Sequence, residues 1–480
     1  MGVGVLNAVE VFRHQAGGAR VRFFGWLGQP SGWMVLSIGL AGITALLTIW
    51  VGSPSFALSN DELAMSLSAD GSMTGTPSPH LVFVSELIGY PLSWLYSMVP
   101  ELGWLSIALL LTNLLSVLAV AWVVRSSGAW VKVTWVLTAL PAIWILTEYP
   151  NYTMTGILAV SMGVALGALG ELRWTTVLSA SALTTVGVLW RAESLVAGLL
   201  LCSLAVSWSV FQRGRAWWRM GVVVTSLVVA KLVALLGRPC TLTSGEECSA
   251  WHYYEQFNAA RHAIHNSVRA DVLYGLVGQE IGWSRSTADL FRAFLSFDHP
   301  MFREPVIAAD SLLPALLQLQ GGGVLAHLSS VAAAFQPYAG WIALWLLASV
   351  TAVLMSAPRG CWRRWLVALG AALLGALLAA ATAALVRLPE RVVLGLTVAL
   401  ALLMVLLIAD LPRPAVTRSR RWAVLAAGVL TLVVGVVLTG PRGVSAVVSA
   451  NSDYRSTRLA LLDALRPYGA STLVAPGWYL

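Results

Sequence analysis

Long apolar segments recur along the chain, and short polar linkers separate most of them. A helix needs about 20 mostly apolar residues to cross a bilayer. Eleven segments meet this requirement, at Trp33–Gly52, Leu102–Val124, Ala129–Leu146, Thr153–Gly170, Trp174–Trp190, Ser194–Phe211, Met220–Leu236, Pro337–Met355, Trp365–Val386, Val392–Leu411 and Trp422–Leu438. The pattern therefore predicts an all-α polytopic membrane protein with about eleven transmembrane helices.

The composition narrows the choice of protein class. Of the 480 residues, 58% are hydrophobic and 11% are charged, whereas a soluble domain has about 45–50% apolar and about 25% charged residues. This contrast excludes a soluble enzyme, a disordered tail and a nucleic-acid-binding domain. The formal net charge of +8 is therefore interpreted first through the positions of the basic residues, which indicate membrane topology, and only then as a sign of binding partners.

One apolar stretch, Leu81–Met98, is nearly long enough to span but contains Glu86, Gly89 and Pro91. If it does not span, the basic clusters fall on one side of the membrane, at Arg13–Arg22, Arg125–Lys132, Arg173, Arg213–Arg219, Arg359–Arg364 and Arg413–Arg421. If it does span, every later cluster moves to the side opposite the basic N-terminus. Basic loops are typical of the cytoplasmic side, so we expect Leu81–Met98 to lie at the outer face as an interfacial or re-entrant helix.

This topology divides the chain into four parts. The predicted parts are a seven-helix module at residues 1–236 with a first outer loop at 53–101, a large outer loop at 237–336, four helices within 337–440, and an outer tail at 441–480. The N-terminus is then cytoplasmic, and the protein is a multi-pass protein of the cell membrane. Cys240 and Cys248 share the second outer loop, where oxidation favours a disulfide between them.

The first outer loop carries adjacent acids, Asp61 and Glu62. Neighbouring side chains on a helix point about 100° apart, so one acid can face a cavity while the other faces elsewhere. The alternative is that both are capping acids, because Ser59 and Asn60 are good N-cap residues. The loop continues through a turn-rich segment that ends at His80, and then through the aromatic Leu81–Met98 stretch. An acid beside a membrane-lying helix suits proton abstraction from an acceptor when a lipid carries the reacting group.

Further polar residues lie at the predicted outer ends of spans. Glu148 and Asn151 supply a second acid or a sugar contact, or else Glu148 is a solvated loop end. Arg191 binds a donor phosphate bidentately, or it pairs with Glu193. Lys231 lies within the seventh span, where a charge tends to mark function, although it is close enough to the outer end to snorkel to the headgroups.

Two other groups complete the list of candidates. Arg387 and Arg391 flank an outer turn, against the positive-inside trend; they bind lipid phosphate or, as the favoured account, form an ion pair with Glu390. In the second loop, one predicted helical face carries the four residues Asn258, Arg261, His262 and His265. This face binds phosphate or an acceptor sugar, or it is a packing surface. A divalent metal at its histidines is not supported, because no third ligand has a suitable spacing.

The first outer loop and the large loop after the seventh span resemble those of the GT-C superfamily of membrane glycosyltransferases. The segments Asn60–Glu62, Thr74–Phe83, Gly89–Tyr96, Phe257–Arg261, Gly282–Ser284 and Asp289–Arg292 also resemble a largely uncharacterised bacterial branch of polytopic proteins. The resemblance covers roughly the first three hundred residues. It implies transfer of a sugar from a polyprenyl-phosphate donor on the outer face, with Asp61 first and Glu62 second as the acid that deprotonates or orients the acceptor.

The expected function is therefore glycosyl transfer to a cell-envelope glycan or lipid acceptor, without a cofactor and without a nucleic-acid partner. The expected substrate-binding residues are His80, Glu148, Asn151, Arg191, Lys231, Asn258, Arg261 and His262. Two alternatives stay open. A transporter or flippase of lipid-linked saccharides would carry polar residues near the bilayer centre. In a scaffold subunit, replacement of Asp61 or Glu62 would leave the function intact.

Overall fold

The computed structural model describes residues 29–51, 61–72, 75–171, 173–196, 198, 216–237 and 390–409. This part of the chain is 82% helical and contains no strand. Its elements are α2 (Pro30–Val51), α3 (Asp61–Ala69), α4 (Glu86–Met98), α5 (Trp104–Val124), α6 (Ala129–Glu148), α7 (Tyr152–Leu169), α8 (Trp174–Trp190), α10 (Ala216–Leu236) and α19 (Glu390–Ala409). The predicted all-α class is therefore confirmed for these residues.

The predicted spans in this part coincide with helices whose ends differ by at most four residues. Four helices are long and apolar enough to cross a membrane, namely α2, α5, α7 and residues Val131–Glu148 of α6. Shorter apolar stretches run through α8, α10 and α19. The predicted spans at Pro337–Met355, Trp365–Val386 and Trp422–Leu438, and nearly all of Ser194–Phe211, lie outside the described residues.

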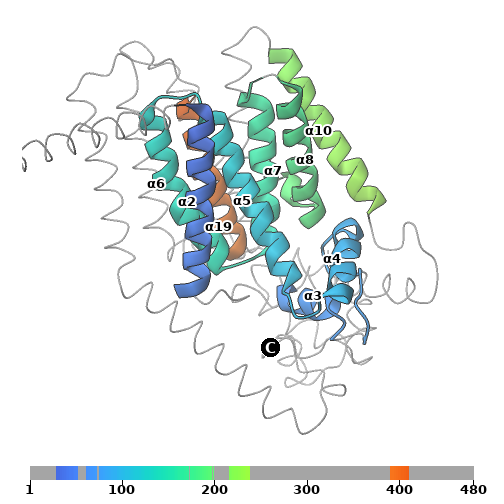
Figure 1. Cartoon of the computed structure of the whole chain (residues 1–480). Coiled ribbons are helices and arrows are strands. Elements are labelled where there is room, and N and C mark those ends of the chain that lie inside the picture. Colours follow the sequence, from blue (N-terminus) through green and yellow to red (C-terminus); the bar gives the residue numbers. More distant parts are fainter. Residues whose placement is uncertain are drawn as a thin grey trace, which may run out of the picture.

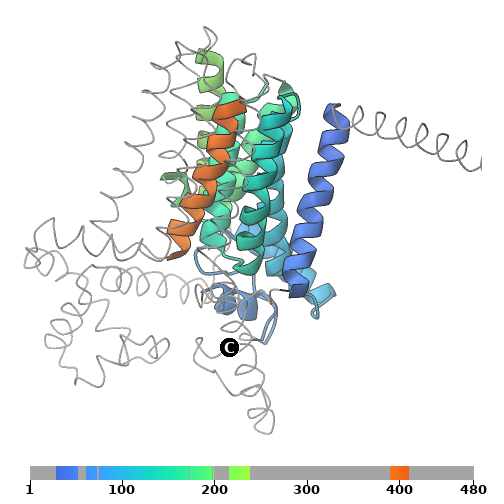
Figure 2. The ribbon, with the colours of Figure 1, turned by 90° about the vertical axis from the view of Figure 1, so that its left-hand side faces the viewer.

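The long helices form one bundle, with α3 and α4 together at one of its ends (Figure 1). Helices α2, α6, α8 and α10 finish at that end, and α5, α7 and α19 begin there. We call it the site end. In the perpendicular view α2 stands at the edge of the bundle, and α19 lies on the opposite side of it (Figure 2).

Helix α7 is the centre of the bundle, because every one of its 18 residues is buried. Small residues let its neighbour α8 approach closely, as is common where membrane helices pack. At Gly163, an added Cβ would lie 2.4 Å from Thr184 Oγ1 and 2.8 Å from the Ala180 carbonyl oxygen. The two helix backbones are therefore in near contact at this position.

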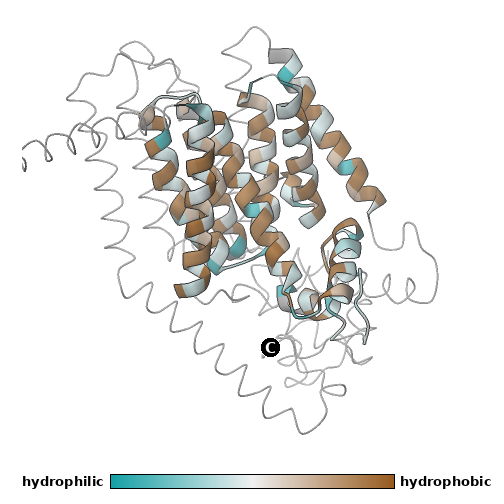
Figure 3. Cartoon of the chain, viewed as in Figure 1, coloured by the Kyte–Doolittle hydropathy of each residue, from teal (hydrophilic) through white to brown (hydrophobic). Residues whose placement is uncertain are grey.

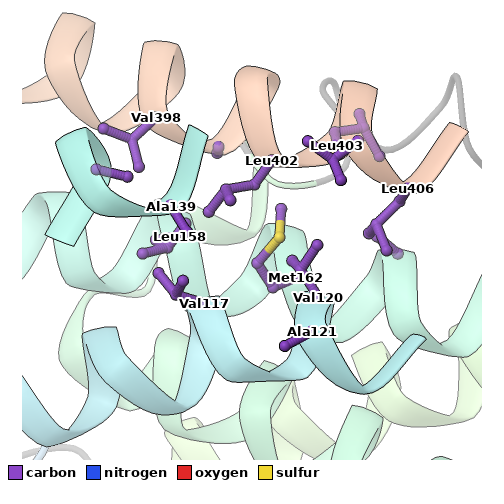
Figure 4. Close-up of a cluster of buried hydrophobic side chains, with 14 of the residues drawn as sticks. Val117, Val120, Ala121, Ala139, Leu158, Met162, Val398, Leu402, Leu403 and Leu406 are labelled. Carbon is purple, nitrogen blue, oxygen red and sulfur yellow. The ribbon is translucent and has the colours of Figure 1, made fainter. Parts of the chain in front are cut away.

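Helix α19 is held in the core although it is distant in sequence from the other described helices. It packs on α7, α6 and α5. The close-up in Figure 4 shows its side chains above those of the three helices, with Val398, Leu402, Leu403 and Leu406 facing Val117, Val120, Ala121, Ala139, Leu158 and Met162. This packing fixes where the first turn of α19 meets the site end.

The helices of the bundle consist mostly of apolar and neutral residues, and few strongly hydrophilic residues interrupt them (Figure 3). Large hydrophobic side chains are openly exposed on α2 and α10, including Leu46 at 67%, Trp50 at 84% and Trp218 at 76%. Contiguous exposure of this kind is unusual for a soluble monomer, whereas it is expected where lipid covers the helix.

Helix α4 does not run the length of the bundle. Its 13 residues extend about 20 Å, which is short of a hydrocarbon core of about 30 Å. At its start, the Ser85 amide donates to the Leu189 carbonyl of α8, and shortly after its end the Trp104 indole of α5 donates to the Val99 carbonyl. Both ends of α4 therefore lie at the site end, which agrees with the prediction that Leu81–Met98 does not span.

Candidate functional site

Glu62 joins α3 to the beginning of α7. Its side chain is fully buried, and its Oε1 accepts hydrogen bonds from Asn151 Nδ2 at 2.6 Å and from the Tyr152 amide at 3.3 Å. Asn151 is the N-cap of α7, where its own Oδ1 accepts from the Thr153 and Met154 amides. A carboxylate is favoured beside a helix N-terminus, so Glu62 anchors α3 on α7.

Asp61 occupies a different environment although it is the adjacent residue. Its side chain is 23% exposed. Its Oδ2 accepts a hydrogen bond from the Tyr152 hydroxyl at 3.3 Å and one from Arg391 NH1 at 2.8 Å. The carboxylate is therefore held between the first residue of α7 and the first turn of α19, and it remains accessible from outside.

A second arginine reaches the same tyrosine from α8. Arg191 follows the last residue of α8, and its NH1 donates to the Tyr152 hydroxyl at 2.5 Å. Its Nε also pairs with Glu193 Oε2 at 3.3 Å, as one of the sequence-based alternatives expected. The Glu193 side chain is 69% exposed, so this ion pair is a weak one.

Phe83 closes the site over the tyrosine ring. The Phe83 and Tyr152 rings are stacked with centroids 6.0 Å apart and an interplanar angle of 3°. The Arg191 guanidinium lies 5.0 Å from the Phe83 centroid and 5.2 Å from the Tyr152 centroid, within the range of cation–π attraction. Phe83 has φ of 67°, a conformation that is rare for a bulky residue and is characteristic of functional sites. We call the residues Asp61, Glu62, Phe83, Asn151, Tyr152, Arg191 and Arg391 the Asp61 cluster.

Three sequence-predicted residues take other places. His80 Nδ1 pairs with Glu86 Oε1 at 2.5 Å, with both side chains largely buried at the start of α4. Glu148 is 1% exposed at the end of α6, so its interpretation as a solvated loop end is wrong. Lys231 lies on an exposed face of α10, beside the exposed apolar side chains of Val228 and Leu232.

Other predictions are not covered by this part of the chain. Asn258, Arg261, His262, Cys240 and Cys248 all lie outside the described residues. Among the residues that are described, no group of three or more histidine, cysteine, aspartate or glutamate side chains is arranged to hold a metal ion.

Sequence reasoning missed two members of the cluster and the partner of a third. Phe83 and Tyr152 belong to segments that had been noted, but nothing in a linear pattern indicates that their rings stack. For Arg391, the sequence favoured a pair with Glu390 and did not indicate the ion pair with Asp61 that the structure shows. The available signal was its positive charge at the outer end of a span, against the positive-inside trend.

The cluster combines groups that serve acid–base chemistry and anion binding. Asp61 is a partly exposed carboxylate, and the two arginines are each 13% exposed. Within the described part of the chain, NH2 of Arg191 and NH2 of Arg391 have no hydrogen-bond partner. A guanidinium with an unused donor edge is suited to a phosphate. No family model, no curated protein and no solved structure matches this chain.

Proposed function

We propose that this protein is a membrane glycosyltransferase of the GT-C type that uses a polyprenyl-phosphate sugar donor and a cell-envelope glycan or lipid acceptor. One observation carries the proposal. A partly exposed carboxylate lies beside two partly buried guanidiniums at one end of an apolar helix bundle. The lipid tail of such a donor would stay in the bilayer while its phosphate and sugar reach this end.

The proposed reaction assigns one task to each kind of group. The Asp61 carboxylate accepts the proton of the acceptor hydroxyl. The acceptor oxygen then bonds to the anomeric carbon of the sugar, and the bond from that carbon to the phosphate oxygen breaks with its electron pair. Negative charge grows on the departing polyprenyl phosphate, so Arg191 and Arg391 would stabilise the transition state more than the bound donor.

The environments of the two acids favour Asp61 as the base. A general base must come within hydrogen-bonding distance of the proton that it removes. Asp61 is 23% exposed, whereas Glu62 is fully buried and its Oε1 is occupied by Asn151 and the Tyr152 amide. Glu62 therefore belongs to the support of the site in this proposal.

The distribution of basic residues supports an extracytoplasmic site. Arg125, Lys132, Arg173 and Arg219 stand at or next to the ends of α5, α6, α8 and α10 that lie opposite the site end. Because basic residues mark the cytoplasmic side, the Asp61 cluster would face outward. Within the described helices, charged residues stand near helix ends, which suits surface chemistry better than translocation through the bundle.

The first experiment measures lipid-linked sugars by mass spectrometry in cells that carry wild-type protein, Asp61→Asn or Glu62→Gln at equal abundance. Loss of a general base lowers the rate by about 10²–10⁴-fold, so the Asp61→Asn cells should accumulate a polyprenyl-phosphate monosaccharide. The Glu62→Gln cells should resemble wild type, because glutamine keeps an acceptor oxygen for Asn151 and Tyr152.

The matched control is Glu171→Gln, which removes a carboxylate that pairs with Arg125 and Arg173 between α7 and α8. It should leave the lipid pools unchanged. Identical pools in wild-type and Asp61→Asn cells, with normal amounts of folded protein, would contradict the transferase assignment and favour a scaffold or transporter.

A further inference from the structure

We propose that the Tyr152 hydroxyl is a positioning group that orients the Asp61 carboxylate and links it to Arg191. The proposal rests on the proposed function, because it explains how the base of that reaction is held. Tyr152 is a buried member of the cluster to which the proposed reaction assigns no task. Tyr152 is fully buried, and its hydroxyl contacts both the Asp61 carboxylate and the Arg191 guanidinium.

The hydroxyl is used in both directions. It accepts a hydrogen bond from Arg191 NH1 at 2.5 Å and donates one to Asp61 Oδ2 at 3.3 Å. Arg391 donates to the same Oδ2 at 2.8 Å. Two donors on a single carboxylate oxygen fix the direction of the carboxylate plane. Without the hydroxyl, Asp61 would keep the contact with Arg391 and lose the one that relates it to α7 and α8.

Three separate restraints hold Tyr152 itself. Its amide donates to Glu62 Oε1, its ring stacks on Phe83, and it begins α7, the helix whose residues are all buried. The left-handed backbone of Phe83 costs about 1–3 kcal/mol, which the surrounding contacts must offset. Tyr152 is therefore held in one position, whereas the arginine side chains on either side of it are long and flexible.

Burial separates a positioning role from direct catalysis. A group that touches substrate needs an approach from the exterior, and the Tyr152 side chain has none. Asp61 does have one, at 23% exposure. The hydroxyl therefore acts through Asp61. A displacement of a catalytic group by about 1 Å is enough to lower a rate by about 10²-fold.

The test is Tyr152→Phe in the full-length chain. Phenylalanine retains the stacked ring and the amide bond to Glu62 and removes only the hydroxyl. The matched control is Tyr96→Phe, since Tyr96 is a buried tyrosine of α4 whose hydroxyl accepts one hydrogen bond, from the Leu105 amide, away from the arginines. Tyr96→Phe loses one hydrogen bond and Tyr152→Phe loses two, so both thermal unfolding temperatures should fall, and that of Tyr152→Phe should fall further.

The two variants should differ in function. We expect Tyr152→Phe cells to accumulate the polyprenyl-phosphate monosaccharide about tenfold or more over wild type, and Tyr96→Phe cells to stay within about twofold of wild type, because the Tyr96 hydroxyl does not contact the cluster. Native mass spectrometry of the purified variants with synthetic polyprenyl phosphate should show near wild-type occupancy for both, because each keeps Arg191 and Arg391. A wild-type lipid pool in Tyr152→Phe cells would overturn the proposal.

Parallel Asp61→Asn cells separate the two levels of inference. If Asp61→Asn raises the donor pool and Tyr152→Phe does not, the positioning role fails and the transferase assignment stands. If neither raises the pool, both are wrong. Should Tyr152→Phe not reach the membrane, Phe83→Leu loosens the ring and keeps the hydroxyl. It should raise the donor pool partially, and an unchanged pool would count against the proposal.

Discussion

Asp61 and Glu62 show how two neighbouring acids acquire different tasks. Their side chains leave α3 about 100° apart, so one is fully buried against α7 and the other is 23% exposed between α7 and α19. Burial of a carboxylate is costly unless hydrogen bonds compensate for it. Asn151 and the Tyr152 amide supply these bonds to Glu62. Its role in stability can therefore be tested apart from chemistry.

Replacement of Glu62 by alanine should destabilise the protein by about 2–5 kcal/mol, because two buried donors lose their acceptor. Glu62→Gln should be much milder, since its amide oxygen can accept from both donors. Thermal unfolding of the purified protein in detergent compares the two variants with wild type. A Glu62→Ala protein that unfolds at the wild-type temperature would show that α3 is not anchored through this side chain.

At the scale of elements, the close approach of α7 and α8 depends on residues without a side chain. At Gly163 a Cβ would lie 2.7 Å from the Thr184 amide nitrogen and 2.8 Å from the Ala180 carbonyl oxygen. Backbone atoms cannot move aside as a flexible side chain can. Separation of the two helices would also shift Arg191, which directly follows α8.

Gly163→Ala should therefore cost about 1–3 kcal/mol of stability through overpacking. Gly42→Ala in α2 is the control, because no atom lies within 4 Å of its added Cβ, and alanine favours a helix over glycine by about 0.5–1 kcal/mol. The two variants should shift the unfolding temperature in opposite directions. Equal shifts would mean that α7 and α8 can separate freely.

The elements themselves were predictable because the signal for a spanning helix is local. Apolar length alone located α5, α6, α7 and α8 to within a few residues. The ends of the helices were less certain, since caps such as Asn151 depend on one side chain. That Leu81–Met98 does not span was predictable only from charges elsewhere in the chain, because its own composition is ambiguous.

The site was predictable in part. Asp61 and Glu62 were named as adjacent acids of the first outer loop, and Asn151 and Arg191 as polar residues at the outer ends of spans. The role of Tyr152 and the contact of Arg391 with Asp61 were missed, because local spacing does not reveal ring stacking or a contact across 330 positions. Topology alone placed His80 and Lys231 near the site. In the structure, His80 pairs with Glu86 instead, and Lys231 lies on an exposed face of α10.

At the scale of the whole molecule, the proposed orientation can be tested by labelling. Single cysteines at Ala192 (beyond α8, at the site end) and at Gly128 (before α6, at the opposite end) are both exposed. In a background without the four native cysteines, a membrane-impermeant maleimide should label Ala192→Cys in intact cells. It should label Gly128→Cys only after permeabilisation. The reverse result would place the Asp61 cluster in the cytoplasm.

The ion pair between Asp61 and Arg391 also has a consequence for biosynthesis. Asp61 is synthesised early and Arg391 follows 330 positions later, while a ribosome adds about 5–20 residues per second. For tens of seconds, the nascent chain therefore holds a charged carboxylate without its arginine. A ribosome that stalls before α19 would therefore leave a chain in which Asp61 lacks its contact with Arg391.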